Sequence, residues 1–388
     1  MAGQSASGTS RAQASARPFS GSGRLRYYRP ELDLLRFFAF FLVFLSHVVP
    51  GNLAFYARAH VPRGVAVLVV GFAEGGAFGV DLFFVLSSFL ITTLLLREQA
   101  VFGAIDVWSF YVRRMLRIWP LYFAFLLVVA PLLGHIEPSE NMPLKYLLAF
   151  ALLFGNWACV LWGYPHSVAS PLWSVSIEEQ FYLSWPFLMR RWINNLGVVA
   201  AALLGVSFIS RLWLVMHGAP HPQIWCNTLA RLDPIACGAL LAVRAERKEF
   251  APAPRMRAML LLLGCTTLAA AGHFGDVVGT KALVTYPAVS AACVSLILGT
   301  LGLRLSHGPM LRALRYLGRI SYGLYVFNAM FVVGIFDVPS VQGPVARPLL
   351  AMAALLATIV TAAASYHFLE MPFLRLKERF TRVRSRPV

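Results

Sequence analysis

The chain has 388 residues, of which 58% are hydrophobic and only 13% are charged, and its mean hydropathy is +0.67. A soluble domain carries roughly 25% charged residues, so this composition excludes an ordinary water-soluble fold and favours a protein embedded in a lipid bilayer. The net charge of +17 would suggest a nucleic-acid partner in a soluble protein, but the cytoplasmic loops of membrane proteins also collect Lys and Arg, so we expect no nucleic-acid partner.

The chain divides into a membrane domain and two basic tails. Residues 1–29 are rich in Ser, Ala, Gly and Arg and predict a disordered cytoplasmic tail, although the same composition also fits a transit peptide. Residues 30–375 are expected to form the transmembrane domain, and 376–388 a second basic cytoplasmic tail. The five cysteines are scattered and none forms C-x-x-C, so we expect neither a disulfide framework nor a metal site.

Apolar stretches recur along the membrane domain, and a helix of about 20 residues can cross a hydrocarbon core of about 30 Å. They predict an all-α membrane helix bundle with about ten transmembrane helices. The second stretch is too long for one straight helix, and Gly75 and Gly76 are expected to break it. The predicted crossings are 32–50, 66–96, 116–134, 174–189, 196–216, 228–243, 258–274, 283–303, 317–336 and 348–370.

The distribution of positive charge predicts the orientation of the bundle. Most Lys and Arg fall in alternate connections and in the two tails, whereas Arg58, Arg63, Lys281 and Arg347 fall on the opposite side. Because cytoplasmic loops carry the excess of positive charge, both termini are predicted to be cytoplasmic. This alternation holds only if the apolar segment 144–162 does not cross. We therefore expect one re-entrant or non-crossing helix there, in a region that lines a cavity.

The first crossing carries two functional candidates. Arg36 and His47 are eleven positions apart, so they lie about 20° apart around a helix and about 16.5 Å apart along it. A channel along this face could connect a cytoplasmic donor with an acceptor on the other side, and His47 is a natural general base near neutral pH. The alternative is that Arg36 extends to the cytoplasmic interface while His47 caps the far end of the helix.

Further charges lie inside apolar segments, where each is a functional hypothesis by default. Asp81 could orient His47, or it could be an interfacial acid. Arg113, Arg114 and Arg117 share one helix face and could bind phosphate, or they could be an ordinary cytoplasmic anchor.

Two more groups of charges have alternatives of the same kind. Glu178 and Glu179 are adjacent, so one should face a cavity and the other a partner charge or the cytoplasmic edge, unless they belong to structural ion pairs. Arg211 and Arg231, close to Asp233, could bind an anionic or polar acceptor, or the alternative is a mutual ion pair between arginine and aspartate.

Taken together, the motifs resemble the acyltransferase type 3 family, whose bacterial members O-acylate surface glycans and related acceptors. The resemblance runs from about Leu32 to Phe373 and follows the family's order. It is carried by LDLLRFFAFFLVFLSH, GVDLFFVLSSFLI, RRMLRIWPLY, LWSVSIEEQFYL, RLDPIACGALLA, LGRISYGLYVFN and SYHFLEMPF. The chain departs from the family pattern at Ser88, where Gly is usual, and at Asn328, where His is frequent, which suggests an altered acceptor or a structural role for Asn328.

This resemblance implies a multi-pass fold of roughly ten spans, with an acyl-CoA donor on the cytoplasmic side and an acceptor reached from the outer side. It implies that Arg36 and His47 are essential, with His47 as the base, and that the three clustered arginines contact phosphate. The candidate catalytic residues are His47, Arg36, Asp81 and Glu178, the candidate CoA-binding residues are Arg113, Arg114 and Arg117, and the candidate acceptor-binding residues are Arg211, Arg231, Glu179 and Asn328.

The sequence thus predicts an O-acyltransferase of the bacterial cytoplasmic membrane. It would move an acyl group, by default acetyl from acetyl-CoA, to a hydroxyl of a glycan or similar acceptor, with no permanently bound cofactor. A glycan-assembly protein is a possible partner. The alternatives are a secondary transporter of a small polar solute, which also predicts intramembrane charges and a re-entrant helix, and a catalytically degenerate partner protein.

Overall fold

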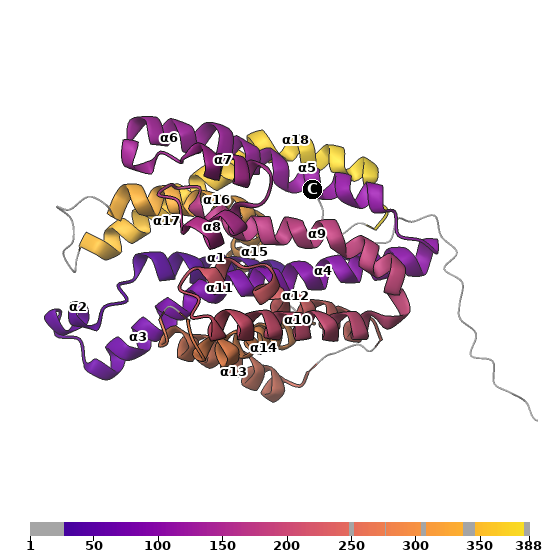
Figure 1. Ribbon diagram of the computed structural model, residues 1–388, viewed down its shortest axis with the longest axis horizontal. Coiled ribbons are helices and arrows are strands. Elements are labelled where there is room, and N and C mark those ends of the chain that lie inside the picture. Colours follow the sequence, from indigo (N-terminus) through magenta and orange to yellow (C-terminus); the bar gives the residue numbers. More distant parts are fainter. Residues whose placement is uncertain (1–26, 248–251, 276, 304–307, 337–345, 384–388) are drawn as a thin grey trace, which may run out of the picture.

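The computed structural model describes residues 27–247, 252–275, 277–303, 308–336 and 346–383, and within these ranges the regular elements are all helical. Most of the long helices run along the longest axis of the molecule as a roughly parallel bundle (Figure 1). This confirms the all-α prediction. The principal helices are α1 (Glu31–Val48), α3 (Arg63–Gly75), α4 (Gly79–Phe102), α5 (Val107–Ala124), α9 (Trp173–Trp192), α10 (Leu196–Met216), α12 (Leu232–Arg247), α13 (Pro254–Gly272), α14 (Lys281–Thr300), α15 (Pro309–Arg319), α16 (Ser321–Phe336) and α17 (Ala346–Ser365).

Shorter helices connect or extend these long ones. Between α1 and α3 lies α2 (Leu53–Arg58), and α6 (Ala130–Ile136) continues α5 after a π-helical turn. The segment between α6 and α9 contains α7 (Leu144–Ala151) and α8 (Gly155–Trp162). Further along the chain, α11 (Gln223–Cys226) precedes α12, and α18 (Met371–Lys377) follows α17 after a second π-helical turn.

Membrane-type helices account for much of the described chain. On length and composition, five helical segments among the described residues could cross a bilayer, and Ser321–Gly334 is a shorter apolar helix. These segments support the prediction that several helices cross a membrane, while the number of about ten crossings stays a prediction. The five segments are Arg63–Phe102, Val107–Ile136, Ser170–Met216, Lys281–Thr300 and Ala346–Phe380.

The long second stretch breaks where its glycines predict. The α-helix α3 ends at Gly75, a 3-10 turn covers Gly76–Phe78, and α4 begins at Gly79. A β-carbon at Gly79 would lie 2.4 Å from the Ala39 carbonyl oxygen of α1, so this glycine also allows the two helices to approach closely. The start of α4 therefore lies directly against α1.

The segment 144–162 differs from the prediction of one helix. It forms α7 and α8, each of 8 residues and so about 12 Å long, which is too short to cross a bilayer. The chain turns between them at Leu153, whose φ is 62°. The Gln180 side chain of α9 donates to the Leu153 carbonyl at 3.0 Å, which satisfies irregular backbone as a membrane interior requires.

Two helices lie at the centre of the bundle. Both α1 and α4 contribute side chains to two separate hydrophobic clusters, one on each side of them. On one side α12 packs closely on α4, because Gly238 has no side chain where a β-carbon would stand 2.5 Å from the Val85 carbonyl oxygen.

The folded chain extends slightly past both predicted domain boundaries. Tyr27 is buried and its ring lies 4.0 Å from the Arg97 guanidinium, so the fold begins before residue 30. At the other end Arg382 forms an ion pair with Asp106 at 2.8 Å, so the segment after 375 packs on the bundle up to 383. Residues 1–26 and 384–388, the rest of the two predicted tails, lie outside the described residues.

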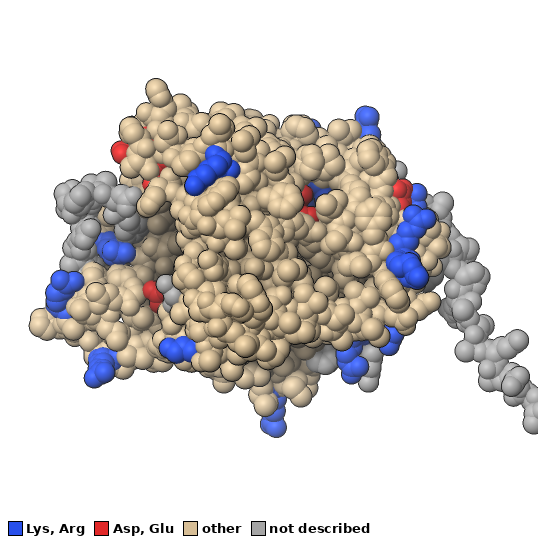
Figure 2. Space-filling view, in the orientation of Figure 1, with Lys and Arg blue, Asp and Glu red and all other residues tan. Residues whose placement is uncertain are grey.

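The surface agrees with a membrane environment. Almost all of the face seen in Figure 2 is uncharged, and most of its Lys and Arg lie near the edges of the view. Many large apolar side chains are exposed on the long helices, including Leu183, Ile209 and Leu262. Exposed apolar area on this scale is costly in water and is expected for helices that face lipid.

Candidate functional site

A cavity of about 530 Å³ lies at the end of the bundle where α1 ends. Its wall includes His47 and Ser46 of α1 and Glu74 of α3, together with the aromatic rings of Trp173 and Trp225. The volume falls within the range of about 300–1,000 Å³ that is usual for small-molecule sites. We call it the His47 cavity.

His47 faces this cavity from the last turn of α1, and its side chain is exposed although the surrounding helix is largely buried. Its Nδ1 atom lies 3.0 Å from Nδ2 of Asn328 on α16. The predicted partner, Asp81, is not the residue that contacts it. The structure thus pairs the candidate base with an amide rather than with a carboxylate.

A narrow passage, with a volume of about 90 Å³, leads from the His47 cavity into the bundle. Val80 of α4 and Tyr325 of α16 line both spaces, so they mark the junction. Tyr325 is held in place because its hydroxyl donates to the Pro171 carbonyl at 3.0 Å and lies 2.7 Å from the Ser174 hydroxyl. The junction is therefore formed by a side chain with two anchoring contacts.

The two adjacent glutamates differ in their relation to the passage. Glu178 lines it and accepts hydrogen bonds from Ser87 and Tyr182, both at 2.9 Å. Glu179 does not line the passage; it is buried and accepts a hydrogen bond from the Trp119 indole at 3.1 Å. Of this pair, Glu178 faces the interior space and Glu179 serves a packing contact.

At its other end the passage meets a second cavity, also of about 90 Å³, which we call the arginine cavity. Arg36, Ser87, Arg114 and Arg117 line both spaces. The His47 cavity, the passage and the arginine cavity therefore form a series of three neighbouring cavities between His47 and the arginines of α5, and each shares lining residues with the next. The positions of Arg36 and His47 on one helix face, predicted from their spacing, place them along this line.

The three clustered arginines divide into two kinds. Arg113 forms an ion pair with Glu98 at 3.1 Å and donates to the Phe380 carbonyl at 2.8 Å, so its guanidinium serves the structure. Arg114 lies over the rings of Phe110 and Tyr182, and neither it nor Arg117 has an ion pair among the described residues. Arg114 and Arg117 are therefore the members of this cluster that can receive an anion.

The arginine cavity also contains one cation, Lys377, that sequence reasoning did not select. Lys377 of α18 lines it, and within the described ranges this lysine has no ion pair. Arg36 lies 3.5 Å from Asp33, a long contact that leaves most of its donors available. Burial raises the pKa of the Tyr27 hydroxyl in the same wall, against the opposing effect of Arg29 and Arg97, so this hydroxyl stays protonated at neutral pH.

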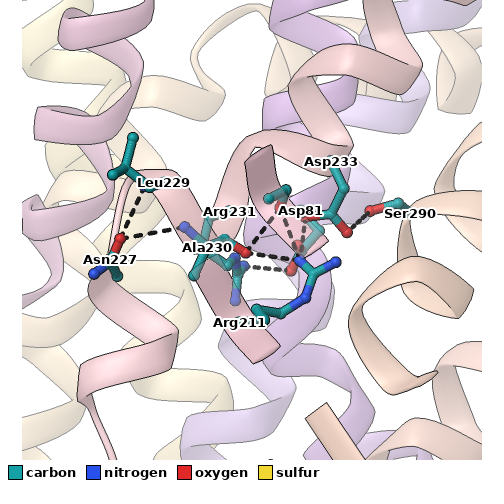
Figure 3. Close-up of polar contacts among 9 residues, drawn as sticks. Asp81, Arg211, Asn227, Leu229, Ala230, Arg231, Asp233 and Ser290 are labelled. Carbon is teal, nitrogen blue, oxygen red and sulfur yellow. Dashed lines mark hydrogen bonds and ion pairs between the residues drawn. The ribbon is translucent and has the colours of Figure 1, made fainter. Parts of the chain in front are cut away.

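Asp81, Arg211 and Arg231 lie elsewhere and form a buried network (Figure 3). Arg231 pairs with Asp81 at 2.8 Å, and Arg211 pairs with Asp233 at 2.7 Å. Ser290 of α14 donates to the second Asp233 oxygen at 2.9 Å. The expected Asp81–His47 contact is thus corrected, because the nearby guanidinium of Arg231 takes this carboxylate.

The two arginines of this network do not line the cavities described above. The side chains of Arg211 and Arg231 are 1% and 0% exposed, so neither is placed to contact an acceptor. The Arg231 guanidinium lies 4.3 Å from the ring of Trp225, behind the wall of the His47 cavity. Both arginines instead form ion pairs with aspartates, which was the alternative for them. These contacts link α4, α10, α12 and α14.

We expect the variant Asp81→Asn to lower the free energy of unfolding by about 3–5 kcal/mol, because it leaves the Arg231 charge buried and unpaired. Chemical unfolding in detergent micelles would measure this. The double variant Asp81→Asn with Arg231→Met should recover much of the loss, since it removes both charges. A single variant as stable as the wild type would contradict a structural role for this pair.

Sequence reasoning missed Lys377 and Tyr325. Lys377 lies in a basic tail, where a cation is the expected background and gives no separate signal. Tyr325 belongs to the SYGLYVFN motif, where the departure from the family pattern pointed to Asn328 alone. Its position one turn before Asn328 could have placed both residues on one helix face.

Comparison with known proteins places the chain among acyltransferases. Residues 29–367 match the family model described as an acyltransferase domain. The peptidoglycan O-acetyltransferase OatA of Listeria monocytogenes is 28% identical over 359 residues, which cover 82% of this chain and 56% of that protein. The putative peptidoglycan O-acetyltransferase YrhL of Bacillus subtilis is 28% identical over 380 residues, covering 89% of this chain and 55% of that protein.

The matches cover only part of each relative. The chain spans about half the length of the curated relatives it matches. No solved structure matches the chain.

Proposed function

Since the chain belongs to the acyltransferase family, we propose that it transfers an acetyl group from acetyl-CoA to a hydroxyl of a cell-wall or surface glycan. The line of three cavities between the unpaired cations and His47 is the observation that carries this proposal. Peptidoglycan is the first acceptor to test, because two of the similar proteins are named for it.

In this proposal the donor enters from the arginine cavity. The phosphates of CoA bind Arg114, Arg117 and Lys377, because guanidinium and ammonium groups form strong charge-assisted hydrogen bonds with phosphate. The slender pantetheine arm follows the passage beside Glu178 and Ser87, past Tyr325. This brings the thioester to the His47 cavity, where the acceptor hydroxyl binds.

His47 then acts as the general base. It takes the proton from the acceptor hydroxyl as the oxygen attacks the thioester carbonyl. The tetrahedral intermediate collapses, the bond from carbon to sulfur breaks, and the leaving thiolate takes the proton from the imidazolium. The products are the O-acetyl glycan and CoA with a free thiol. Transfer through an acetylated His47 is a covalent version of the same proposal.

The proposal includes the topology that the charge distribution predicts. About ten helices cross the cytoplasmic membrane of a bacterium, both termini face the cytoplasm, and α7 and α8 do not cross. The arginine cavity then faces the cytoplasm, where acyl-CoA is available, and the His47 cavity faces outward. Because the predicted outer loops are short, we also propose a glycan-assembly protein as the partner that presents the acceptor.

The test uses the purified full chain in lipid nanodiscs with radiolabelled acetyl-CoA and peptidoglycan fragments. We expect label in the glycan that mild base releases, because O-esters are base-labile and amides are not. Empty nanodiscs serve as the control. Binding of acetyl-CoA without transfer to peptidoglycan would redirect the search to other glycans, and failure to bind acyl-CoA would overturn the proposal.

A further inference from the structure

The contact with Asn328 is the one hydrogen bond of the His47 side chain within the described residues. Asn328 is 2% exposed, and its Oδ1 atom has no hydrogen-bond partner among the described residues. The amide is therefore fully desolvated and directed at a single ring nitrogen. Such a buried and half-satisfied amide beside a functional histidine needs a physical explanation.

The amide can meet the ring in two ways. In one, its NH₂ group donates to an unprotonated Nδ1, which places the proton of the neutral imidazole on Nε2. In the other, the amide is rotated by 180°, so its carbonyl oxygen accepts a hydrogen bond from Nδ1–H and Nε2 keeps a lone pair. Either orientation leaves one amide group unpaired, so burial alone does not choose between them.

If His47 is the base of the proposed reaction, the chemistry favours one of the two amide orientations. A base needs a lone pair directed at the substrate, and Nδ1 is already covered by the amide. We propose that Asn328 is a positioning residue whose carbonyl oxygen holds Nδ1–H and so presents the unprotonated Nε2 of His47 to the His47 cavity. This inference rests on the proposed function for the role of His47, although not for the contact itself.

The fold supports such a role because it fixes Asn328 firmly. Asn328 lies on α16, which packs against α1, and Tyr325 one turn earlier is anchored to Pro171 and Ser174. A fixed amide determines both the tautomer and the ring orientation of His47, as an orienting carboxylate does for other catalytic histidines. During the reaction the acceptor proton goes to Nε2, and the Nδ1 proton stays with the Asn328 carbonyl.

A direct test reads the tautomer without any turnover. Histidine nitrogens are labelled with ¹⁵N in the full chain in nanodiscs, and the His47 signal is identified among the nine histidines by its loss in His47→Gln. We expect Nδ1 protonated and Nε2 bare in the wild type. In Asn328→Leu, which removes the acceptor at similar size, the ring should shift toward the Nε2–H tautomer. A wild-type ring that already carries its proton on Nε2 would overturn the proposal.

The kinetic test compares three substitutions on α16. Asn328→Leu should lower kcat by about 10- to 100-fold, as loss of an orienting partner commonly does, with little change in KM for acetyl-CoA. Asn328→Asp should recover most of this loss, because a carboxylate accepts the same Nδ1–H. Met330→Leu, which changes a half-buried side chain two residues away, serves as the matched control.

The pH profile separates positioning from simple packing. In Asn328→Asp the new carboxylate favours the imidazolium, so activity should be lost at a higher pH on the acidic side than in the wild type. The other titratable groups in the wall of the His47 cavity are Glu74 of α3, His221, Tyr164 and Tyr325, and they are the same in both proteins. An unmoved profile together with a normal kcat in Asn328→Leu would overturn the proposal.

The outcomes for the two proposals are distinguishable. If His47→Gln keeps full activity, the role of His47 in the proposed function fails, while the tautomer experiment still decides whether Asn328 holds the ring. If His47→Gln is inactive and both Asn328 variants match the wild type, the positioning role alone fails.

Discussion

Replacing His47 by glutamine is expected to lower kcat by about 10²- to 10⁴-fold, the usual contribution of a general base. Glutamine keeps much of the size and a hydrogen-bonding end, but it cannot take a proton near neutral pH. KM for acetyl-CoA should change little, because the cations that would bind its phosphates lie beyond the passage. Initial rates of label transfer in nanodiscs, measured at several donor concentrations, would provide both parameters.

His217→Gln provides the matched control for this experiment. His217 is exposed at the end of α10, contacts the Trp213 carbonyl at 2.8 Å, and lies outside the walls of the three cavities. Its substitution should leave transfer close to the wild-type rate. If His47→Gln were as active as His217→Gln, both the general-base and the covalent versions of the mechanism would be excluded.

The sequence predicted the helical elements well because their signals are local. Long apolar stretches and paired glycines act through hydrocarbon thickness and backbone freedom, and both can be read from a single segment. The break at Gly75 and Gly76 is the clearest case. The segment 144–162 was harder, because the turn that divides it into α7 and α8 is contacted by the Gln180 side chain, which lies outside the segment on α9.

The site was predictable where its residues share a helix and less so where they do not. The spacing of Arg36 and His47 defines a common face on α1, and the cavities follow it. Which carboxylate pairs with which cation depends on how separate helices pack. Asp81 could have been close to His47 from its depth alone, but the approach of α12 to α4 through Gly238 places Arg231 beside it instead.

Whether a cation of the arginine cavity can bind the donor phosphates should depend on whether it already has an ion-pair partner, and not only on its position in the cavity wall. Arg113 lies in the wall of the arginine cavity but is engaged by Glu98 and a backbone carbonyl, whereas Arg114, Arg117 and Lys377 are not paired in the part of the chain described. A cation that already has a carboxylate must give up that contact before it can bind phosphate. In the proposed function, the cluster of three arginines therefore supplies two groups for the donor phosphates, and Lys377 of α18 supplies a third.

This division predicts the donor affinity of the variants. Arg117→Gln and Lys377→Gln should each raise KM for acetyl-CoA by about 10- to 100-fold, because a hydrogen bond between charged groups contributes about 1.5–3 kcal/mol and each 1.4 kcal/mol is about tenfold. At saturating donor, kcat should fall much less than the affinity. Arg113→Gln should instead weaken the packing of the chain end around Phe380, seen as a lower unfolding temperature.

Repeating the titration with dephospho-CoA thioesters would identify which phosphate each cation contacts. A cation that binds the 3′-phosphate loses its effect on KM when that phosphate is absent, whereas one that binds the diphosphate keeps it. If Arg113→Gln raised KM while Arg117→Gln and Lys377→Gln left it at the wild-type value, the arginine cavity would not bind the donor as proposed. The donor would then have to reach His47 by another route, since the passage beside Glu178 starts among these cations.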